Sequence, residues 1–356
     1  WGKMIEKYLR KSSQLKQVFL LIDIRHDPSD NDRMMYDWIV NNGFRPVIVA
    51  TKLDKINKVP DTVDVIPPDQ EDFETDTSKE PKDIIELKPE EVDWSEIEPF
   101  LDDDLLNILL VGQDRREGEG RQRSDSMILC SINPDTKQIS MISFLRDLYV
   151  QIPGGYSDNR LNAAYVFGGF PLLMDTLHTN FGVSIDGCFE VDFSGFQSVI
   201  DILGGVDIEM TSKEARIINI GTESGVYHLD GTKALAYSRI RKIDNDFYRT
   251  QRQRNVLQAI YTKFRQSNAA DLMKLLDEVL PYLSTDMTNS QIMLLAAKCI
   301  PIMGSAELSS YRVPADDAYH YASIRGMSVV VPDLDKIHED LLNEYLPLNA
   351  EKESSE

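Results

Sequence analysis

Residues 126–144, SMILCSINPDTKQISMISF, decide how this 356-residue chain is expected to fold. Two apolar stretches, at 126–133 and 139–144, lie on either side of an Asn-Pro-Asp sequence at 133–135. Asparagine, proline and aspartate favour tight turns, and short apolar runs bounded by turn residues are typical of buried strands. The stretch therefore predicts two neighbouring strands that are joined by a turn.

The sequence on both sides of this pair predicts more strands and many helices. Two further strands are expected at 107–112 and 188–191. The expected helices lie at 161–165, 169–181, 193–203, 231–238, 250–266, 268–283, 288–299 and 333–345. Mixed strands and helices in this order predict an α/β fold, with a three-layer α/β/α domain around a central mixed sheet. This domain is expected over 105–346, with a polar tail at 347–356.

The first 58 residues predict a separate, partial α/β unit. An apolar strand at 17–23, a helix at 31–42 and a second strand at 46–50 have the spacing of a parallel βαβ unit. The second strand leads into Thr-Lys-Leu-Asp at 51–54, the pattern with which GTPases read guanine. No G-x-x-x-x-G-K-[ST] phosphate-binding loop occurs in the sequence, so we expect no GTPase activity.

Residues 59–104 predict a disordered linker. They contain 18 acidic residues against three lysines, together with six prolines. A segment this polar cannot bury enough apolar surface to offset the entropy lost on ordering. Much of the formal net charge of −21 lies here, and the remaining chain is not basic enough to predict a nucleic-acid-binding face. No stretch approaches the roughly 18 apolar residues of a membrane helix, and the sequence shows no signal peptide.

The residues that point to chemistry gather in two stretches, 107–128 and 237–254. The first carries Asp114 and Asp125, at the end of an apolar strand and across a Gly-rich loop. The second carries Arg239, Arg241, Arg249, Arg252 and Arg254. Carboxylates can hold a hard cation such as Mg²⁺, and guanidinium groups bind phosphate oxygens with two parallel hydrogen bonds. Together they indicate a pyrophosphate site, although acids in turns and arginines on a solvated helix would also give this pattern.

The segment 105–345 resembles the LytR-CpsA-Psr family of cell-wall glycopolymer ligases. The motifs that carry the resemblance are LLVGQDRR, RSDSMILCSINPDTKQISMISFLRDLYVQIPG, RLNAAYVFGG, FSGFQSVIDILGGVDIEM, YHLDGTKALAYSRIRKIDNDFYRTQRQR and YRVPADDAYHY. The resemblance implies an enzyme that moves a glycopolymer phosphate from an undecaprenyl-pyrophosphate-linked donor to a peptidoglycan sugar hydroxyl. It implies a Mg²⁺ cofactor and a site on the extracytoplasmic face of the cell membrane, reached through the lipid donor.

The resemblance also implies roles for particular residues. Asp114 and Asp125 match the magnesium-binding pair and, with Arg146, the catalytic residues. Either aspartate is a candidate general base, and Asp246 is a candidate for orienting the arginines. The lipid is expected in an apolar pocket lined by helices such as 169–181 and 193–203. The resemblance implies that pyrophosphate is bound by Arg146, Arg239, Arg241, Arg249 and Gln253. Arg116 and Arg123, which flank the two carboxylates, are second candidates.

Three departures from the family pattern are visible. Gln113 replaces a small residue, with Arg115 in the same turn, and 144–145 is Phe-Leu where Ile-Pro is usual. Neither change removes a charged group, so we expect the site to survive with an altered loop. The third departure is at the N-terminal side, where the usual membrane helix is replaced by the unit at 1–58 and the acidic linker.

Residues 1–58 resemble the latter part of an EngB-type (YihA-type) ribosome-biogenesis GTPase. The matching motifs are WGKMIEKYLRK, QVFLLIDIRH, DWIVNNGF and VIVATKLDKI. The resemblance implies that Lys52 and Asp54 are vestiges of a guanine-binding site. Two alternative functions therefore stand beside the ligase: a polyprenyl-pyrophosphate hydrolase with water as acceptor, and a ribosome-assembly GTP-binding protein.

Overall fold

The computed structural model describes residues 84–94, 97, 99–100, 104–113, 115, 121–241, 243 and 246–348, and the backbone of two earlier strands. The chain forms two units, Trp1–Phe73 and Glu74–Glu356. In the first, β1 (Val18–Asp23) and β2 (Pro46–Thr51) pair in parallel, as the βαβ pattern predicts. The predicted helix at 31–42, Lys52 and Asp54 lie outside the described residues.

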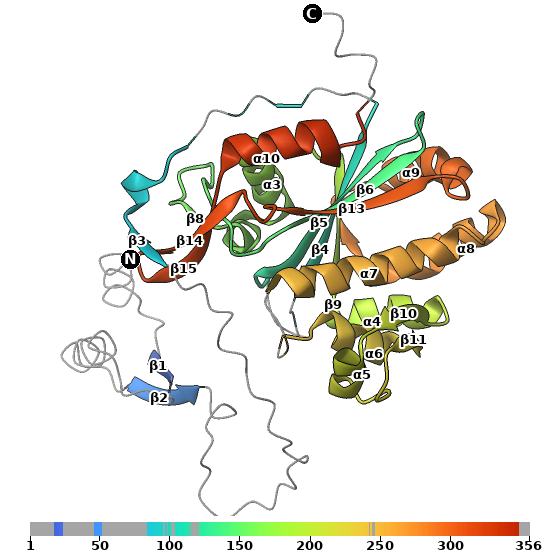
Figure 1. The fold of residues 1–356 in the computed structure, drawn as a ribbon, viewed down its shortest axis with the longest axis horizontal. Helices are drawn as coiled ribbons and strands as arrows, with labels where there is room; N and C mark the ends of the chain where they lie inside the picture. Colours follow the sequence, from blue (N-terminus) through green and yellow to red (C-terminus); the bar gives the residue numbers. More distant parts are fainter. Residues whose placement is uncertain are drawn as a thin grey trace, which may run out of the picture. The chain divides into compact units, whose positions relative to one another are not determined.

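The second unit is built on a six-stranded mixed sheet (Figure 1). Its order is β12-β9-β4-β5-β6-β13. The antiparallel trio β4-β5-β6 forms the centre, while β9 is parallel to β4 and β13 is parallel to β6. The strands span β4 (Leu106–Gln113), β5 (Ser124–Asn133), β6 (Gln138–Phe144), β9 (Gly187–Asp192), β12 (Ser284–Thr285) and β13 (Glu307–Val313). The predicted α/β class and the strand pair around the Asn-Pro-Asp turn are thus confirmed.

Helices cover both faces of this sheet. In Figure 1, α3 (Leu161–Phe181) and α10 (Leu334–Asp340) lie on one side, and α7 (Asp246–Phe264) and α8 (Ala269–Val279) lie on the other. The other α-helices in the described part of the chain are α4 (Phe193–Ile202), α5 (Ser212–Ile217), α6 (Gly231–Ser238) and α9 (Asn289–Cys299). In the described part of the chain, no helix has the length and apolarity needed to span a bilayer.

The main core lies between the sheet and α3. Successive residues of a strand point to opposite faces, so Leu109 of β4 and Leu129 of β5 face α3 and are fully buried. They pack with residues of α3 such as Leu173 and Leu177, which are also fully buried. Leu110, the next residue of β4 after Leu109, points to the opposite face of the sheet and lines a cavity. The two faces of one strand therefore have different roles.

Several elements differ from those that the sequence predicts. The helices expected at 161–165 and 169–181 form one element, α3, with a kink at Gly169, where φ is 68° and ψ is −151°. The helix expected at 268–283 ends at Val279, because Pro281 closes it into a 3₁₀ turn at Leu280–Tyr282.

The predicted helix at 333–345 also changes character along its length. It is α-helical only as far as Asp340, and a π-helical turn follows at Leu341–Tyr345. Leu341 and Tyr345 in this segment are buried against the main core.

Part of the segment 59–104, predicted to be a disordered linker, has ordered structure. Strand β3 (Ile85–Leu87) pairs in parallel with β14 (Tyr319–Ile324), which pairs in turn with β15 (Met327–Pro332). Trp94 stacks on Tyr149 with ring centroids 5.9 Å apart. The local sequence does not predict this ordered structure, because it depends on distant residues. Strand β14 pairs with β3, and the ring of Tyr149 stacks on Trp94.

Some strands were not expected from the sequence. Strand β10 (Val206–Met210), in which apolar and acidic residues alternate, pairs antiparallel with β11 (Gly225–Leu229). Helix α5 lies between them in the sequence. Two short strands, β7 (Tyr149–Val150) and β8 (Asn159–Arg160), pair before α3. Strands β13 to β15 lie in the stretch between the last two predicted helices, where no strand was predicted.

The buried centre of the sheet gives a test of the fold. Leu109→Ala should lower the free energy of unfolding by about 2–5 kcal/mol, because it removes a fully buried side chain and leaves a cavity. The matched control is Leu294→Ala in α9, where the side chain is 61% exposed and the loss should stay within about 0.5 kcal/mol. Urea denaturation measures both changes, and equal losses would contradict the core described here.

Candidate active site

The site lies at the edge of the sheet where three strand ends meet. β4 ends at Gln113, the antiparallel β5 begins beside it at Ser124, and β6 ends nearby at Phe144. Asp125 follows the first residue of β5, and Arg146 follows the end of β6 by two residues. Sheet register therefore brings together two residues that are 21 positions apart in the chain.

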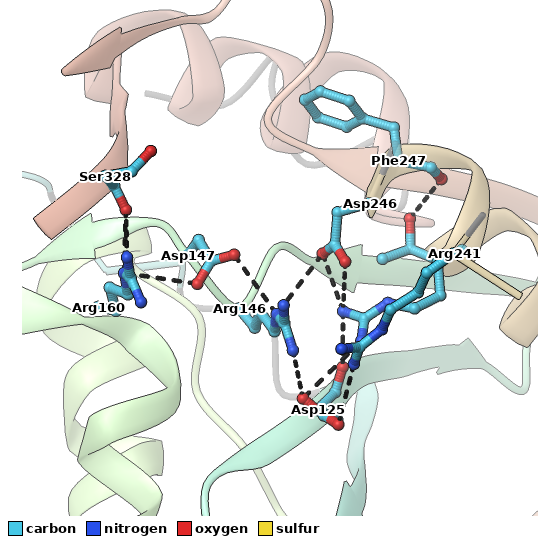
Figure 2. A network of polar contacts seen from close by, with 10 residues as sticks. Asp125, Arg146, Asp147, Arg160, Arg241, Asp246, Phe247 and Ser328 are labelled. Carbon is cyan, nitrogen blue, oxygen red and sulfur yellow. Dashed lines mark hydrogen bonds and ion pairs between the residues drawn. The ribbon is translucent and has the colours of Figure 1, made fainter. Parts of the chain in front are cut away.

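Asp125 is the centre of a cluster of arginines (Figure 2). Arg146 Nη1 lies 2.6 Å from Asp125 Oδ1, and Arg241 Nη2 lies 3.3 Å from Asp125 Oδ2. Arg249 Nη1 is 3.8 Å from the same carboxylate, and Arg249 Nη2 donates to the Asp125 main-chain carbonyl at 3.3 Å. One carboxylate thus holds guanidinium groups from the end of β6, from the loop after α6 and from α7.

A second carboxylate, Asp246, braces the same arginines from the other side. Asp246 is the first residue of α7 and lies one turn before Arg249, whose Nη2 donates to it at 2.8 Å. Arg146 Nε lies 3.9 Å from Asp246. Because Arg249 is only 2% exposed, these carboxylates compensate a guanidinium that is almost completely removed from water.

The polar contacts continue away from the cluster. Arg146 Nε donates to Asp147 at 3.4 Å, and Arg160 Nε lies 3.5 Å from the same side chain. Arg160 also donates to the main-chain carbonyl of Ser328 in β15 (Figure 2). Asp147, Arg160 and Ser328 were not singled out from the sequence. The signal for Asp147 was its adjacency to Arg146, whereas no local pattern marks Ser328, whose contact is through its backbone.

The arginines set the ionisation of Asp125. Burial alone would raise the pKa of this carboxyl, but the positive charges of Arg146, Arg249 and Arg241 outweigh burial and hold the pKa below its usual value. Burial lowers the pKa of Arg249, partly opposed by Asp246. The carboxylate is therefore ionised at neutral pH, and the cluster is a preassembled group of positive charges around it.

A large apolar cavity of about 320 Å³ opens beside this cluster. It lies between the sheet face that carries Leu110 and the helices α4, α6, α7 and α8. Its apolar lining includes Leu110, Ile128, Phe196, Val199, Leu257 and Leu276. Its charged and polar lining includes Asp125, Arg239, Arg241, Arg249 and Gln253. The arrangement fits a ligand with a long apolar part and an anionic end.

Two of the buried polar atoms without a hydrogen-bond partner belong to α7 residues that line this cavity. They are Nε of Arg249 and Oε1 of Gln253, both within the described part of the chain. A buried unpaired polar atom is costly, and a bound polar ligand is one way to satisfy it. Arg239 lies 4.1 Å above the ring of Phe193, so its guanidinium is held at the edge of the cavity.

The structure separates the predicted site residues into groups. Asp125, Arg146, Arg241 and Arg249 form the cluster, while Arg239 and Gln253 line the cavity. Arg123 is exposed just before β5 and does not line the cavity. Asp114 and Arg116 lie outside the described residues.

Two arginines of the same sequence stretch point elsewhere. Arg252 Nε lies 2.7 Å from Glu214 of α5, and Arg254 Nε donates to Ser310 of β13 at 2.7 Å. Helix periodicity explains the division, because Arg249 and Gln253 are four residues apart on one face of α7.

The cavity also corrects one expectation about its walls. Helix α4, expected at 193–203, lines the cavity through Phe196 and Val199. The helix expected at 169–181 does not, because α3 packs on the opposite face of the sheet and its apolar residues fill the main core. Periodic apolar residues look the same in a helix that fills a core and in one that borders a cavity.

Among the described residues, the arginine cluster contains two carboxylates, Asp125 and Asp246. No group of three or more His, Cys, Asp or Glu side chains able to hold a metal occurs among the described residues. Mg²⁺ often takes one or two carboxylates and completes its shell with phosphate oxygens and water, so this number of carboxylates fits the ion. A magnesium ion here would therefore depend on a phosphate ligand.

Comparison with known proteins identifies the class. The LytR_cpsA_psr family model matches residues 70–341, and the chain belongs to this family. Regulatory protein MsrR of Staphylococcus aureus (strain COL) is 32% identical over 227 residues, which cover 62% of this chain and 68% of that protein. Membership of this family supports a general role in cell-wall glycopolymer attachment.

Solved structures show the same fold. The crystal structure of Bacillus subtilis TagV has a TM-score of 0.56 and 27% identity, and the match covers 68% of this chain and 97% of that one. TagT bound to LI-WTA has a TM-score of 0.55 and 27% identity, with 67% and 88% covered. YwtF (TagT) with bound octaprenyl pyrophosphate lipid has a TM-score of 0.53 and 24% identity, with 68% and 91% covered.

The N-terminal stretch matches a different protein. Over 58 residues it is 95% identical to the probable GTP-binding protein EngB of Lachnospira eligens (strain ATCC 27750 / DSM 3376 / VPI C15-48 / C15-B4). The match covers 16% of this chain and 28% of that protein. The chain therefore combines a short EngB-like stretch with a LytR_cpsA_psr domain.

The charge balance around Asp125 predicts a pH-dependent stability. Asp125→Asn should cost roughly 2 kcal/mol at neutral pH, because it leaves three guanidinium groups without their shared carboxylate in a partly buried site. Since the pKa of Asp125 is lowered in the folded state, its stabilisation is present above the unfolded pKa and disappears as the pH falls through the folded one. The difference between wild type and variant should therefore shrink in acid.

Urea unfolding at neutral and acidic pH measures this difference. The control is Asp316→Asn, which removes an ion pair to Arg312 from a carboxylate that is 90% exposed, and should change stability little. A difference at Asp125 that is the same at all pH values would contradict the assigned charge balance.

Proposed function

We propose that this chain is a phosphotransferase of the LytR_cpsA_psr type. The donor is a glycopolymer linked through pyrophosphate to a polyprenyl lipid such as undecaprenol, and the acceptor is a peptidoglycan sugar hydroxyl. The observation that carries this proposal is that Asp125, Arg241 and Arg249 of the arginine cluster also line the apolar cavity. An amphipathic ligand with a doubly anionic head and a long apolar tail fits both parts together.

The residues of the cluster suit the charge of a pyrophosphate. Arg146, Arg241 and Arg249 present planar groups that bind phosphate oxygens bidentately and stay charged at all physiological pH values. Charge that develops on the leaving lipid phosphate would be stabilised by the same groups. The unpaired atoms of Arg249 and Gln253 provide further donors and acceptors for the head group.

We propose Mg²⁺ as the cofactor. Asp125 would hold it, together with Asp114, which the family resemblance pairs with it and which lies outside the described residues. When bound, the ion supplies Lewis acidity and neutralises charge on the phosphates.

The comparisons support the nature of the donor. TagT has been solved with LI-WTA, and YwtF (TagT), whose likeness to this chain shows the fold alone, with octaprenyl pyrophosphate. Transfer of such a donor to peptidoglycan places the reaction on the extracytoplasmic face of the cell membrane. No nucleic acid is involved in this proposal, and the EngB-like stretch has no assigned part in it.

Filling the cavity should block the donor. Val199→Trp places a large ring in the apolar lining of the cavity, where it would occupy space that a lipid tail needs. We expect affinity for octaprenyl pyrophosphate to fall at least tenfold, measured by isothermal titration calorimetry. Val226→Trp, at a site on β11 that is 70% exposed and not part of the lining, should bind like wild type. Unchanged binding by both variants would contradict a tail-binding cavity.

The reaction itself is tested by product analysis. The purified chain should transfer label from a lipid-pyrophosphate-linked glycan to peptidoglycan oligomers in the presence of Mg²⁺, and transfer should stop when EDTA is added. Arg249→Lys retains a positive charge but loses the bidentate geometry, so kcat should fall by about 10²-fold or more. Glycan phosphate released into water at the wild-type rate, without transfer, would identify a hydrolase instead.

A further inference from the structure

A smaller cavity lies next to Arg146 and shares Asp246 with the arginine cluster. Its volume is about 80 Å³. Leu145 and Val330 form apolar walls, Asp147 and Asp246 provide carboxylates, and Ser328 lies at an exposed position on its border. A cavity needs about 10–15 Å³ to hold one water molecule, so this one has room for a hydroxyl group and the carbon that carries it.

The two cavities lie on either side of the arginines. Arg249 contacts Asp125, which lines the large cavity, and Asp246, which lines the small one. Arg146 likewise contacts both carboxylates. Figure 2 shows Asp125 on one side of the Arg146 guanidinium and Asp246 on the other. A phosphate group held by these arginines would therefore border both cavities.

Phosphoryl transfer requires separate paths for the attacking oxygen and the leaving oxygen. The attacking and leaving oxygens lie roughly in line on opposite sides of the phosphorus. If the lipid tail occupies the large cavity, the lipid phosphate leaves in that direction. The acceptor oxygen must then arrive from the side of the small cavity, where carboxylates are present to accept a hydrogen bond from a hydroxyl group.

We propose that the small cavity receives the acceptor sugar hydroxyl and that Asp246, which lines it, is the general base in place of Asp114 or Asp125. This inference rests on the proposed donor and reaction. The hydroxyl oxygen forms a bond to the phosphorus that carries the glycopolymer, while the bond from that phosphorus to the bridging oxygen breaks. The bridging oxygen leaves with its electron pair as part of the polyprenyl phosphate. The hydroxyl proton passes to the Asp246 carboxylate.

The choice of Asp246 over Asp147 follows from their partners. Asp246 is paired with Arg249 and Arg146, which are both groups that a pyrophosphate would engage. Donor binding would draw these guanidinium groups toward the phosphates and leave Asp246 free to accept a proton. Asp147 is also paired with Arg160, which is anchored on the Ser328 carbonyl and would keep its partner after the donor binds.

Blocking the small cavity tests the acceptor route. Ser328→Trp should raise the KM for peptidoglycan oligomers at least tenfold and leave the affinity for octaprenyl pyrophosphate unchanged. The contact of Ser328 with Arg160 is through the backbone carbonyl, so the substitution retains it. Ser309→Trp, at an exposed position of β13, is the matched control and should show the wild-type KM. An unchanged acceptor KM in Ser328→Trp would overturn this route.

A second pair of variants tests the base. Asp246→Asn keeps a side-chain oxygen for Arg249 but cannot take up the proton, so kcat should fall by about 10²–10⁴-fold with donor affinity within threefold of wild type. Asp147→Asn should lower kcat much less, and Asp246→Glu should restore part of the activity. Equal losses in the two asparagine variants, or a loss of donor affinity that matches the loss of kcat, would overturn the assignment.

The same measurements separate this inference from the proposed function. If the wild-type protein neither binds octaprenyl pyrophosphate nor transfers label, both the proposed function and this inference are wrong. Wild-type protein that transfers label, with Ser328→Trp and Asp246→Asn behaving like their controls, would leave the transferase standing and remove only the acceptor cavity and its base.

Discussion

The structure of the site depends on the balance between Asp125 and the arginines around it. Three guanidinium groups within reach of one carboxylate would repel one another if that carboxylate were absent, most of all at Arg249, which is almost fully buried. Asp246 shares the task from the other side. The protein thus stores a concentrated positive charge in the folded state without the substrate, and an anionic ligand can take the place of these internal partners.

The two faces of the central sheet differ, and this difference places the charged cluster beside an apolar cavity. One face is filled by α3 and forms the main core, as Leu109 and Leu129 show. The other face carries Leu110 and Ile128 and is left open between the sheet and α4, α7 and α8. Because the strand ends that carry Asp125 and Arg146 border this open face, a charged site and an apolar cavity meet at one edge. The small cavity beyond Arg146 gives that edge a second approach.

Much of the fold could be predicted from local patterns. The turn at 133–135 and the apolar runs beside it correctly predict β5 and β6, and the helical stretches correctly predict α4, α6 and α9 within a few residues. The elements that were not predicted depend on contacts between distant segments. Strand β3 is ordered by pairing with β14, more than 230 positions away, and the alternating residues of β10 become a strand by pairing with β11. The local sequence of a strand does not show which distant strand will pair with it.

The sequence by itself determined the class of domain and the residue types of the site, because apolar periodicity and chemical character are local properties of the chain. Only the tertiary structure decided which arginines act together. Arg249 reaches Asp125, whereas Arg252 and Arg254, a few positions along the same helix, face Glu214 and Ser310. It also decided that α4 and not α3 borders the cavity, and that Asp147 is tied to β15 through Arg160. These outcomes depend on which face of each helix and strand meets which neighbour, and that is set by packing across the whole sheet.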